Sequence, residues 1–137
     1  MTTTSYDLCL KNGHVMISDD LEQTNVFVKN GKISLISDKF HESEDFIDCK
    51  NLTILPGVID SQVHFREPGL EGKETLESGM LSAVAGGVTA IFEMPNTNPP
   101  TSNKKEFQRK LDLAKNRMYC NYAFYFGATA DNSNELA

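Results

Sequence analysis

The chain has 137 residues, of which 39% are apolar and 23% charged, a composition that fits a folded globular chain and excludes a disordered one. Its formal charge is −6, and no stripe of lysine and arginine could neutralise phosphates, which disfavours a nucleic-acid partner. The N-terminal segment shows no basic-then-apolar leader pattern, and no apolar run approaches the ~18 residues of a membrane span, so we expect a cytoplasmic protein.

Residues 1–55 are predicted to form a small β-sandwich-like domain. Apolar and polar residues alternate over Tyr6–Lys11, the period of a half-buried strand, and Asn12-Gly13 is expected to turn the chain. Asn30-Gly31 separates two further alternating runs, and this dipeptide predicts a hairpin because both residues tolerate positive φ. Edge strands are expected at Ile47 and at Leu52–Leu55.

Residues 56–137 show a different pattern, in which apolar strands alternate with helical spacing. Strands are predicted at 58–65, 88–94 and 122–126, with helices around 76–85 and 104–118 between them. Gly86-Gly87 should end the first helix, and Thr101 or Ser102 should cap the second. This order predicts parallel strands with crossover helices, either in an open doubly wound sheet or at the start of a (β/α)8 barrel. A full barrel needs ~250 residues and only about 80 follow Pro56, so a barrel would be incomplete here.

The segment after Pro56-Gly57 holds the residues that could carry chemistry. On a strand, Asp60, Gln62 and His64 point to one side, and polar groups there are costly to bury unless they bind something. Pro68-Gly69 ends the strand, which places them near its C-terminal end, where α/β proteins build active sites. From these residues alone, His64 could equally be a hydrogen-bonded structural histidine.

Two groups of charged residues are predicted to be solvated. One comprises Glu67 and Glu71, in a polar loop. The other is a helix face interleaved with acidic residues, formed by Lys104, Lys105, Arg109 and Lys110.

Three motifs resemble those of the dihydroorotases, of the amidohydrolase superfamily. Residues 56–69, PGVIDSQVHFREPG, resemble the family's first-strand signature. Residues 85–89, AGGVT, resemble the turn after its first helix, and residues 94–100, MPNTNPP, resemble the loop after its second strand. The resemblance implies the small β-sandwich-like domain over 1–55, followed over 56–137 by the first three β/α units of a metal-dependent (β/α)8 TIM barrel.

The resemblance also implies roles for individual residues. His64 matches the second of two first-strand histidines that bind a buried zinc, in a centre of one or two metals per subunit. Arg66 and Asn96 match residues that hold the carboxylate of dihydroorotate. The family's catalytic base and remaining ligands belong to later strands, so no catalytic residue is expected within this chain. The implied activity of the parent protein is the interconversion of dihydroorotate and N-carbamoyl-aspartate in pyrimidine synthesis, by a metal-activated water.

Gln62 departs from the family pattern, because it stands where the first histidine is usual. Its neutral amide oxygen is a poor zinc ligand beside an imidazole. The metal site of this chain is therefore expected to be weak or absent. A second hypothesis follows, in which the parent protein is a non-catalytic dihydroorotase-like or dihydropyrimidinase-like scaffold, for example for an aspartate transcarbamoylase. A hydantoinase or allantoinase is a third. The expected partners are the small-molecule substrate and, as options, a second copy or the transcarbamoylase.

Overall fold

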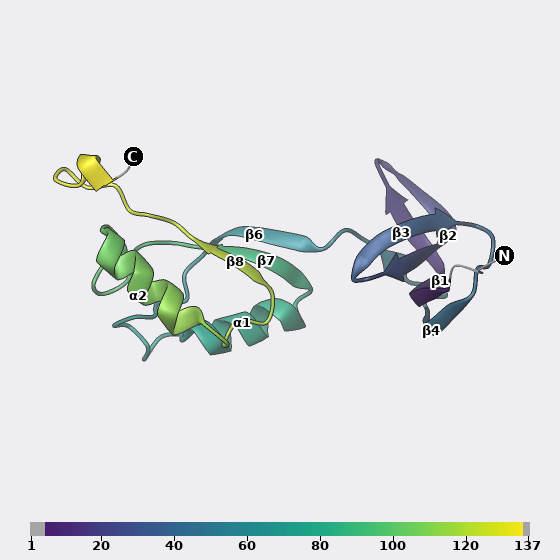
Figure 1. The fold of residues 1–137 in the computed structure, drawn as a ribbon, viewed down its shortest axis with the longest axis horizontal. Coiled ribbons are helices and arrows are strands. Elements are labelled where there is room, and N and C mark those ends of the chain that lie inside the picture. The colour runs from purple at the N-terminus through teal and green to yellow at the C-terminus, as the bar shows by residue number, and fades with distance from the viewer. Residues whose placement is uncertain (1–4, 136–137) are drawn as a thin grey trace. The chain divides into compact units, whose positions relative to one another are not determined.

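The structure is a computed structural model that describes residues 5–135 (Figure 1). The chain divides into two compact units, Met1–Pro56 and Gly57–Ala137, each of which has its own sheet. Among the described residues no helix is both long and apolar enough to cross a membrane.

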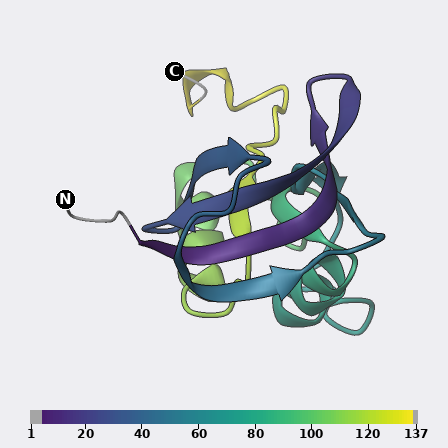
Figure 2. The ribbon, with the colours of Figure 1, turned by 90° about the vertical axis from the view of Figure 1, so that its right-hand side faces the viewer.

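The first unit is one five-stranded sheet, and its regular elements within residues 5–56 are all strands. The sheet order is β3-β2-β1-β4, and β5 pairs with β1 as well. The strands are β1 (Tyr6–Ile17), β2 (Asp20–Lys29), β3 (Lys32–Ser37), β4 (Ser43–Asp48) and β5 (Thr53–Ile54). Figure 2 shows the strands of this sheet, with the long β1 between β2 and β4. The prediction of an all-β unit is right, but the strands form a single hydrogen-bonded sheet instead of two stacked ones.

The two Asn-Gly pairs of this unit behave differently. Asn30 (φ 52°) and Gly31 (φ 70°) join β2 to the antiparallel β3, as the hairpin prediction requires. Asn12 also has positive φ (63°), but β1 continues through it with a shift of register between Leu10 and Gly13. The predicted turn at Asn12-Gly13 is therefore wrong. A residue in the left-handed region within a paired strand produces a bulge, and β1 is held here by a backbone hydrogen bond from Asn12 to Asn25 Oδ1 (3.0 Å).

The second unit alternates strands and helices and ends in a short 3-10 turn, η1 (Ser133–Glu135). Its strands pair in parallel in the order β6-β7-β8, which confirms the predicted crossover arrangement. The elements are β6 (Val58–Val63), α1 (Leu76–Ala85), β7 (Val88–Glu93), α2 (Lys104–Ala114) and β8 (Asn121–Phe124).

Local side-chain chemistry fixes the helix ends. Helix α1 begins after Thr75, whose hydroxyl accepts a hydrogen bond from the Ser78 backbone (3.1 Å) in a capping box. It ends at Gly86, and Gly87 follows with φ +84°, as predicted. Helix α2 is capped by Asn103, not by Thr101 or Ser102. Asn103 Oδ1 accepts from the Glu106 backbone (2.9 Å).

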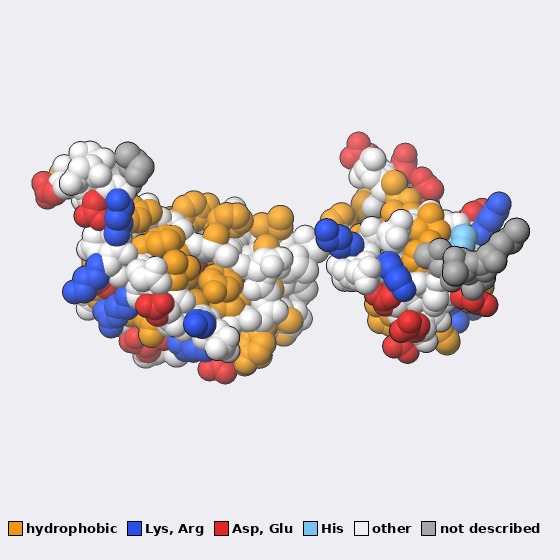
Figure 3. Space-filling model, in the orientation of Figure 1, with side chains coloured by type: hydrophobic (Ala, Val, Ile, Leu, Met, Phe, Trp, Pro, Cys, Tyr) orange, Lys and Arg blue, Asp and Glu red, His pale blue; other side chains and the backbone are white. Residues whose placement is uncertain are grey.

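The sheet of this unit has one covered face and one open face. The core between sheet and helices contains Phe65, Leu76, Met80, Ile91, Ala114 and Phe124, and Figure 1 shows α1 and α2 on the same side of the strands. Large apolar side chains of the strands remain exposed, and Figure 3 shows hydrophobic groups gathered where β6, β7 and β8 lie. They include Val58, Ile59, Phe92 and Tyr122.

Candidate functional site

The candidate site lies at the C-terminal ends of β6 and β7. These strands are parallel, with Val63 opposite Glu93, and the Met94 backbone donates a hydrogen bond to Val63 O (2.9 Å). The two chain segments that leave the sheet at this point therefore start side by side. Active-site loops in α/β proteins occupy this same edge.

His64 and Asn96 are brought into direct contact at this edge. His64 Nδ1 lies 2.8 Å from Asn96 Oδ1, although the residues are 32 positions apart in the sequence. His64 is half-buried and Asn96 is exposed, so a ligand can reach the pair from solvent. The parity of the first strand and the position of the second loop predicted this proximity.

Arg66 and Gln62 flank the pair without bonding to it. Arg66 is half-buried and has φ +68°, a conformation that costs a non-glycine residue about 1 kcal/mol or more. Gln62 is exposed and lines a hollow of about 540 Å³ together with Met94 and Tyr125, at the ends of all three strands. Among the described residues neither side chain makes a hydrogen bond to His64 or Asn96. Asn96 lies at the same end of the strands as His64, as the cluster prediction requires.

The loop after β6 and the loop after β7 are joined to each other. The Asn98 backbone donates to Pro68 O (2.9 Å). Gly69 adopts φ +87°, and a Cβ on it would lie 1.9 Å from Asn98 O. Only glycine allows this approach, because any side chain would collide with the backbone of the other loop. This contact helps to hold the loop that carries Arg66 in register with the loop that carries Asn96.

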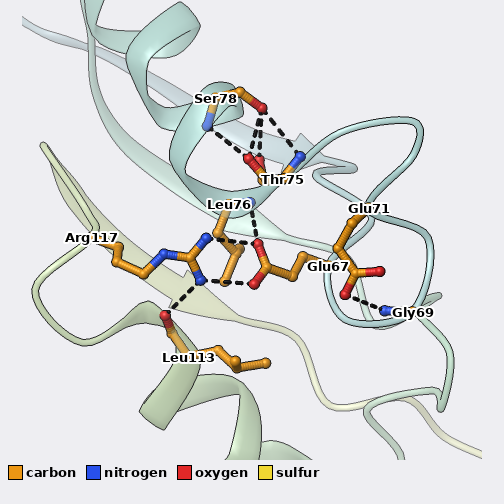
Figure 4. A network of polar contacts seen from close by, with 8 residues as sticks. All are labelled: Glu67, Gly69, Glu71, Thr75, Leu76, Ser78, Leu113 and Arg117. Carbon is orange, nitrogen blue, oxygen red and sulfur yellow. Dashed lines mark hydrogen bonds and ion pairs between the residues drawn. The ribbon is translucent and has the colours of Figure 1, made fainter.

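Glu67, the residue after Arg66, ties this loop to the start of α1 and to Arg117 (Figure 4). Its carboxylate accepts from both terminal nitrogens of Arg117 (2.7 and 3.0 Å) and from the Leu76 backbone at the start of α1 (2.9 Å). The side chain is only 8% exposed. The hydrogen bonds from Arg117 lower the pKa of Glu67. The prediction of a solvated glutamate is therefore wrong for Glu67, and it missed a partner 50 residues away. Glu71 is exposed, as predicted, and accepts from the Gly69 backbone (2.7 Å).

A second ion pair lies inside the core, between Glu93 at the end of β7 and Lys110 of α2. The Glu93 and Lys110 side chains are 1% and 0% exposed. Lys110 Nζ also donates to Met94 O (3.2 Å), at the root of the Asn96 loop. Burial raises the pKa of Glu93 and lowers that of Lys110, because each charge has lost its water.

The assignment of Lys110 to a solvated helix face is therefore wrong. A signal was present in the sequence, because Lys110 lies three residues after Phe107 and four before Ala114, spacings that put it on the apolar face of α2. Lys104, Lys105 and Arg109 are exposed, as predicted.

The residues present do not fit a zinc site on their own. Within residues 5–135 no three His, Cys, Asp or Glu side chains lie close enough to hold a metal ion together. His64 supplies one imidazole, and Gln62 can add only a neutral amide oxygen.

Comparison with known proteins identifies the family of this arrangement. The model of the Dihydro-orotase-like family matches residues 51–136, which include both site loops. The dihydroorotase of Methanothermobacter thermautotrophicus is 39% identical over 123 residues, 89% of this chain and 28% of the relative. That of Methanosarcina mazei is 35% identical over 127 residues, 91% of this chain and 28% of the relative. An allantoinase of Desulfitobacterium hafniense is 36% identical over 133 residues, 96% of this chain and 30% of the relative.

Among solved structures, the L-hydantoinase (dihydropyrimidinase) of Arthrobacter aurescens has a TM-score of 0.89 and 33% identity, over 96% of this chain and 30% of that one. The chain thus spans less than a third of the length of each of these proteins.

Proposed function

Because the chain belongs to the dihydro-orotase-like family, we propose that it is the N-terminal part of a cyclic amidohydrolase that interconverts dihydroorotate and N-carbamoyl-aspartate. The observation that carries the proposal is the 2.8 Å contact of His64 with Asn96 at the strand ends, with Arg66 two residues beyond His64. In this proposal β6, β7 and β8 are the first three strands of a (β/α)8 barrel. Their parallel order and the exposed apolar side chains of the strands support that reading.

Arg66 and Asn96 are proposed to bind the substrate carboxylate. A guanidinium presents paired N–H donors that match the two oxygens of a carboxylate, and charge-assisted bonds of this kind are about twice as strong as neutral ones. The Asn96 side-chain nitrogen can donate a further hydrogen bond, because its amide oxygen is the atom that contacts His64. This part of the chain would then recognise and orient the substrate, and the chemical step would use groups outside it.

Zinc is proposed to be bound by the whole protein, one or two ions per subunit, mainly through ligands that this chain does not contain. His64 would be the ligand that this chain contributes. Gln62 would contribute little, because a neutral amide oxygen is a poor zinc ligand. Zinc would supply an activated water when bound.

Two other functions compete with this proposal. A hydantoinase or allantoinase is supported by the comparable identity of the allantoinase and hydantoinase matches. A scaffold that binds a transcarbamoylase is supported only by the loss of the first histidine at Gln62.

The deciding experiment measures turnover of dihydroorotate, allantoin and hydantoin by the metal-loaded full-length protein and by Arg66→Met. Dihydroorotate carries a carboxylate and the other two substrates do not. We expect turnover of dihydroorotate with a KM at least tenfold higher in Arg66→Met, since one charge-assisted bond is worth about 1.5–3 kcal/mol. Preferred turnover of allantoin or hydantoin, unaffected by Arg66→Met, would favour the second function. No turnover of any substrate would favour the scaffold.

A further inference from the structure

Strand β6 contains a bulge at Ser61 and Gln62. From Asp60 to Val63 the strand advances by three residues, while the paired stretch of β7 advances by two. In a regular strand neighbouring side chains point to opposite faces, whereas Ser61 and Gln62 both line the hollow of about 540 Å³ at the strand ends. A bulge accounts for this arrangement, because its extra residue breaks the alternation and redirects a side chain.

Two side chains hold the backbone of this bulge. The Asp60 carboxylate accepts a hydrogen bond from the Gln62 backbone (3.0 Å), and the Tyr125 hydroxyl donates one to Ser61 O (3.2 Å). The Tyr125 backbone also donates to Glu93 O, at the end of β7 (2.9 Å). Tyr125 therefore reaches from the end of β8 past β7 to β6. The direction in which Gln62 leaves the strand is fixed by these bonds and not by the sheet ladder alone.

The hollow presents an amide group and an aromatic ring to a ligand. Gln62 is exposed, and its side chain makes no hydrogen bond within residues 5–135. Its amide carries an acceptor and a donor side by side, which is the complement of the –CO–NH– edge of a cyclic amide. Tyr125 is held by its bond to Ser61 O and packs on Phe92, with the ring centroids 6.0 Å apart. A fixed aromatic ring gives a flat apolar wall, and a hollow with such walls and few polar groups suits a small ring.

The poor fit of these residues to zinc agrees with a different role for Gln62. A neutral amide oxygen adds little to a zinc site, whereas an amide pairs well with another amide and needs no charge to do so. The residue that is weak as a metal ligand is therefore well suited to recognise a ring.

We propose that Gln62 is a substrate-binding residue that pairs with the amide edge of the ring, and that it is not a zinc ligand. Tyr125 walls this subsite and, through its bond to Ser61 O, positions Gln62. The ligand class is a cyclic amide or ureide, with or without a carboxylate. The inference rests on the proposed function for the identity of the substrate, but ring binding can be measured without a carboxylate and without turnover.

The test uses uracil as the probe and the zinc-loaded full-length protein. Uracil has –CO–NH– edges, no carboxylate for Arg66, and a conjugated ring that resists hydrolysis. Its Kd is measured by ligand-observed NMR, and the zinc content of each protein by elemental analysis. Gln62→Ala removes the pairing amide, and Tyr125→Phe removes the hydroxyl but keeps the ring. Gln108→Ala, at an exposed glutamine of α2, is the matched control.

We expect uracil to bind equally to the unsubstituted protein and to Gln108→Ala, and about tenfold more weakly to Gln62→Ala, the loss expected for two neutral hydrogen bonds. Tyr125→Phe should weaken binding by a smaller factor, because the wall remains while the bulge is less fixed. Zinc content should be the same in all four proteins. An unchanged Kd in Gln62→Ala, a loss of zinc from that variant, or no uracil binding by the unsubstituted protein would overturn the proposal. An unchanged Kd in Tyr125→Phe would overturn the positioning role of Tyr125.

Failure of the proposed function gives a different result. If Gln62→Ala weakens uracil binding but the full-length protein does not turn over dihydroorotate, the substrate assignment is wrong and the ring subsite stands. If dihydroorotate is turned over while uracil binding is independent of Gln62, the ring subsite is wrong and the proposed function stands.

Discussion

Replacing Lys110 by Met should destabilise the second unit strongly, and by an amount that depends on pH. The substitution leaves the Glu93 carboxylate in the core without its cation, and Glu93 can lose this buried charge only by taking up a proton. For a carboxyl group with the ordinary pKa of 4.5, protonation at pH 7 costs about 3.4 kcal/mol, at 1.36 kcal/mol per pH unit. Loss of the hydrogen bond to Met94 O adds about 1 kcal/mol. The sum agrees with the 3–5 kcal/mol typical for removal of one partner of a buried pair.

The measurement is urea unfolding followed by tyrosine fluorescence. Three of the four tyrosines, Tyr119, Tyr122 and Tyr125, lie in the second unit, and the chain has no tryptophan. The protonation cost should fall to about 1.4 kcal/mol at pH 5.5, so the penalty should shrink as the pH is lowered. Lys105→Met, on the exposed side of the same helix, is the control.

A double substitution tests whether the loss of stability comes from the unpaired charge of Glu93. Glu93→Met together with Lys110→Met removes both charges, and such replacements are often neutral or stabilising. Equal urea midpoints for Lys110→Met and Lys105→Met would refute the argument that the buried pair matters. A loss of unfolding free energy in Lys110→Met that stays constant between pH 5.5 and 8 would refute the argument that Glu93 loses its charge by protonation.

Three further predictions concern the site loops. The pKa of Glu67 is lowered in the folded protein, so its stabilising effect should be full above pH 4.5 and should be lost as the pH falls through the folded pKa. Arg117→Gln should therefore make the free energy of unfolding depend less on pH over that range, as measured by acid-unfolding curves. Gly69→Ala should lower the free energy of unfolding by about 1–3 kcal/mol or more in urea titrations, because its Cβ would collide with Asn98 O, whereas Gly72→Ala should be tolerated because nothing lies near it. The 137-residue chain alone should show no dihydroorotate turnover and should bind zinc weakly in metal analysis, because His64 is its single imidazole at the site; stoichiometric zinc with turnover would contradict this.

The succession of strands and helices along the chain was predictable because it rests on short-range signals. Asn30-Gly31 encodes its own turn, and Gly86-Gly87 encodes a helix end, whatever the rest of the chain does. The bulge at Asn12 was not predictable from the same kind of dipeptide, because its outcome depends on Asn25 in the neighbouring strand.

The site was predictable to the same extent. His64 and Asn96 follow neighbouring strands, so parallel pairing suffices to bring them together. The buried ion pairs of Glu67 and Glu93 were not predictable. The burial of Glu67 depends on Arg117, fifty residues later, and that of Glu93 depends on Lys110 across the core. Charged residues are rarely buried unless paired, and a single sequence does not show the pairs.

The close approach of Gly69 to Asn98 has a consequence for protein engineering. Here the loop after β6 and the loop after β7 share a backbone hydrogen bond and a contact with no room for a Cβ. A transplant of either loop alone would bring an unmatched backbone to that contact. The two loops should therefore be grafted together, as a single cassette.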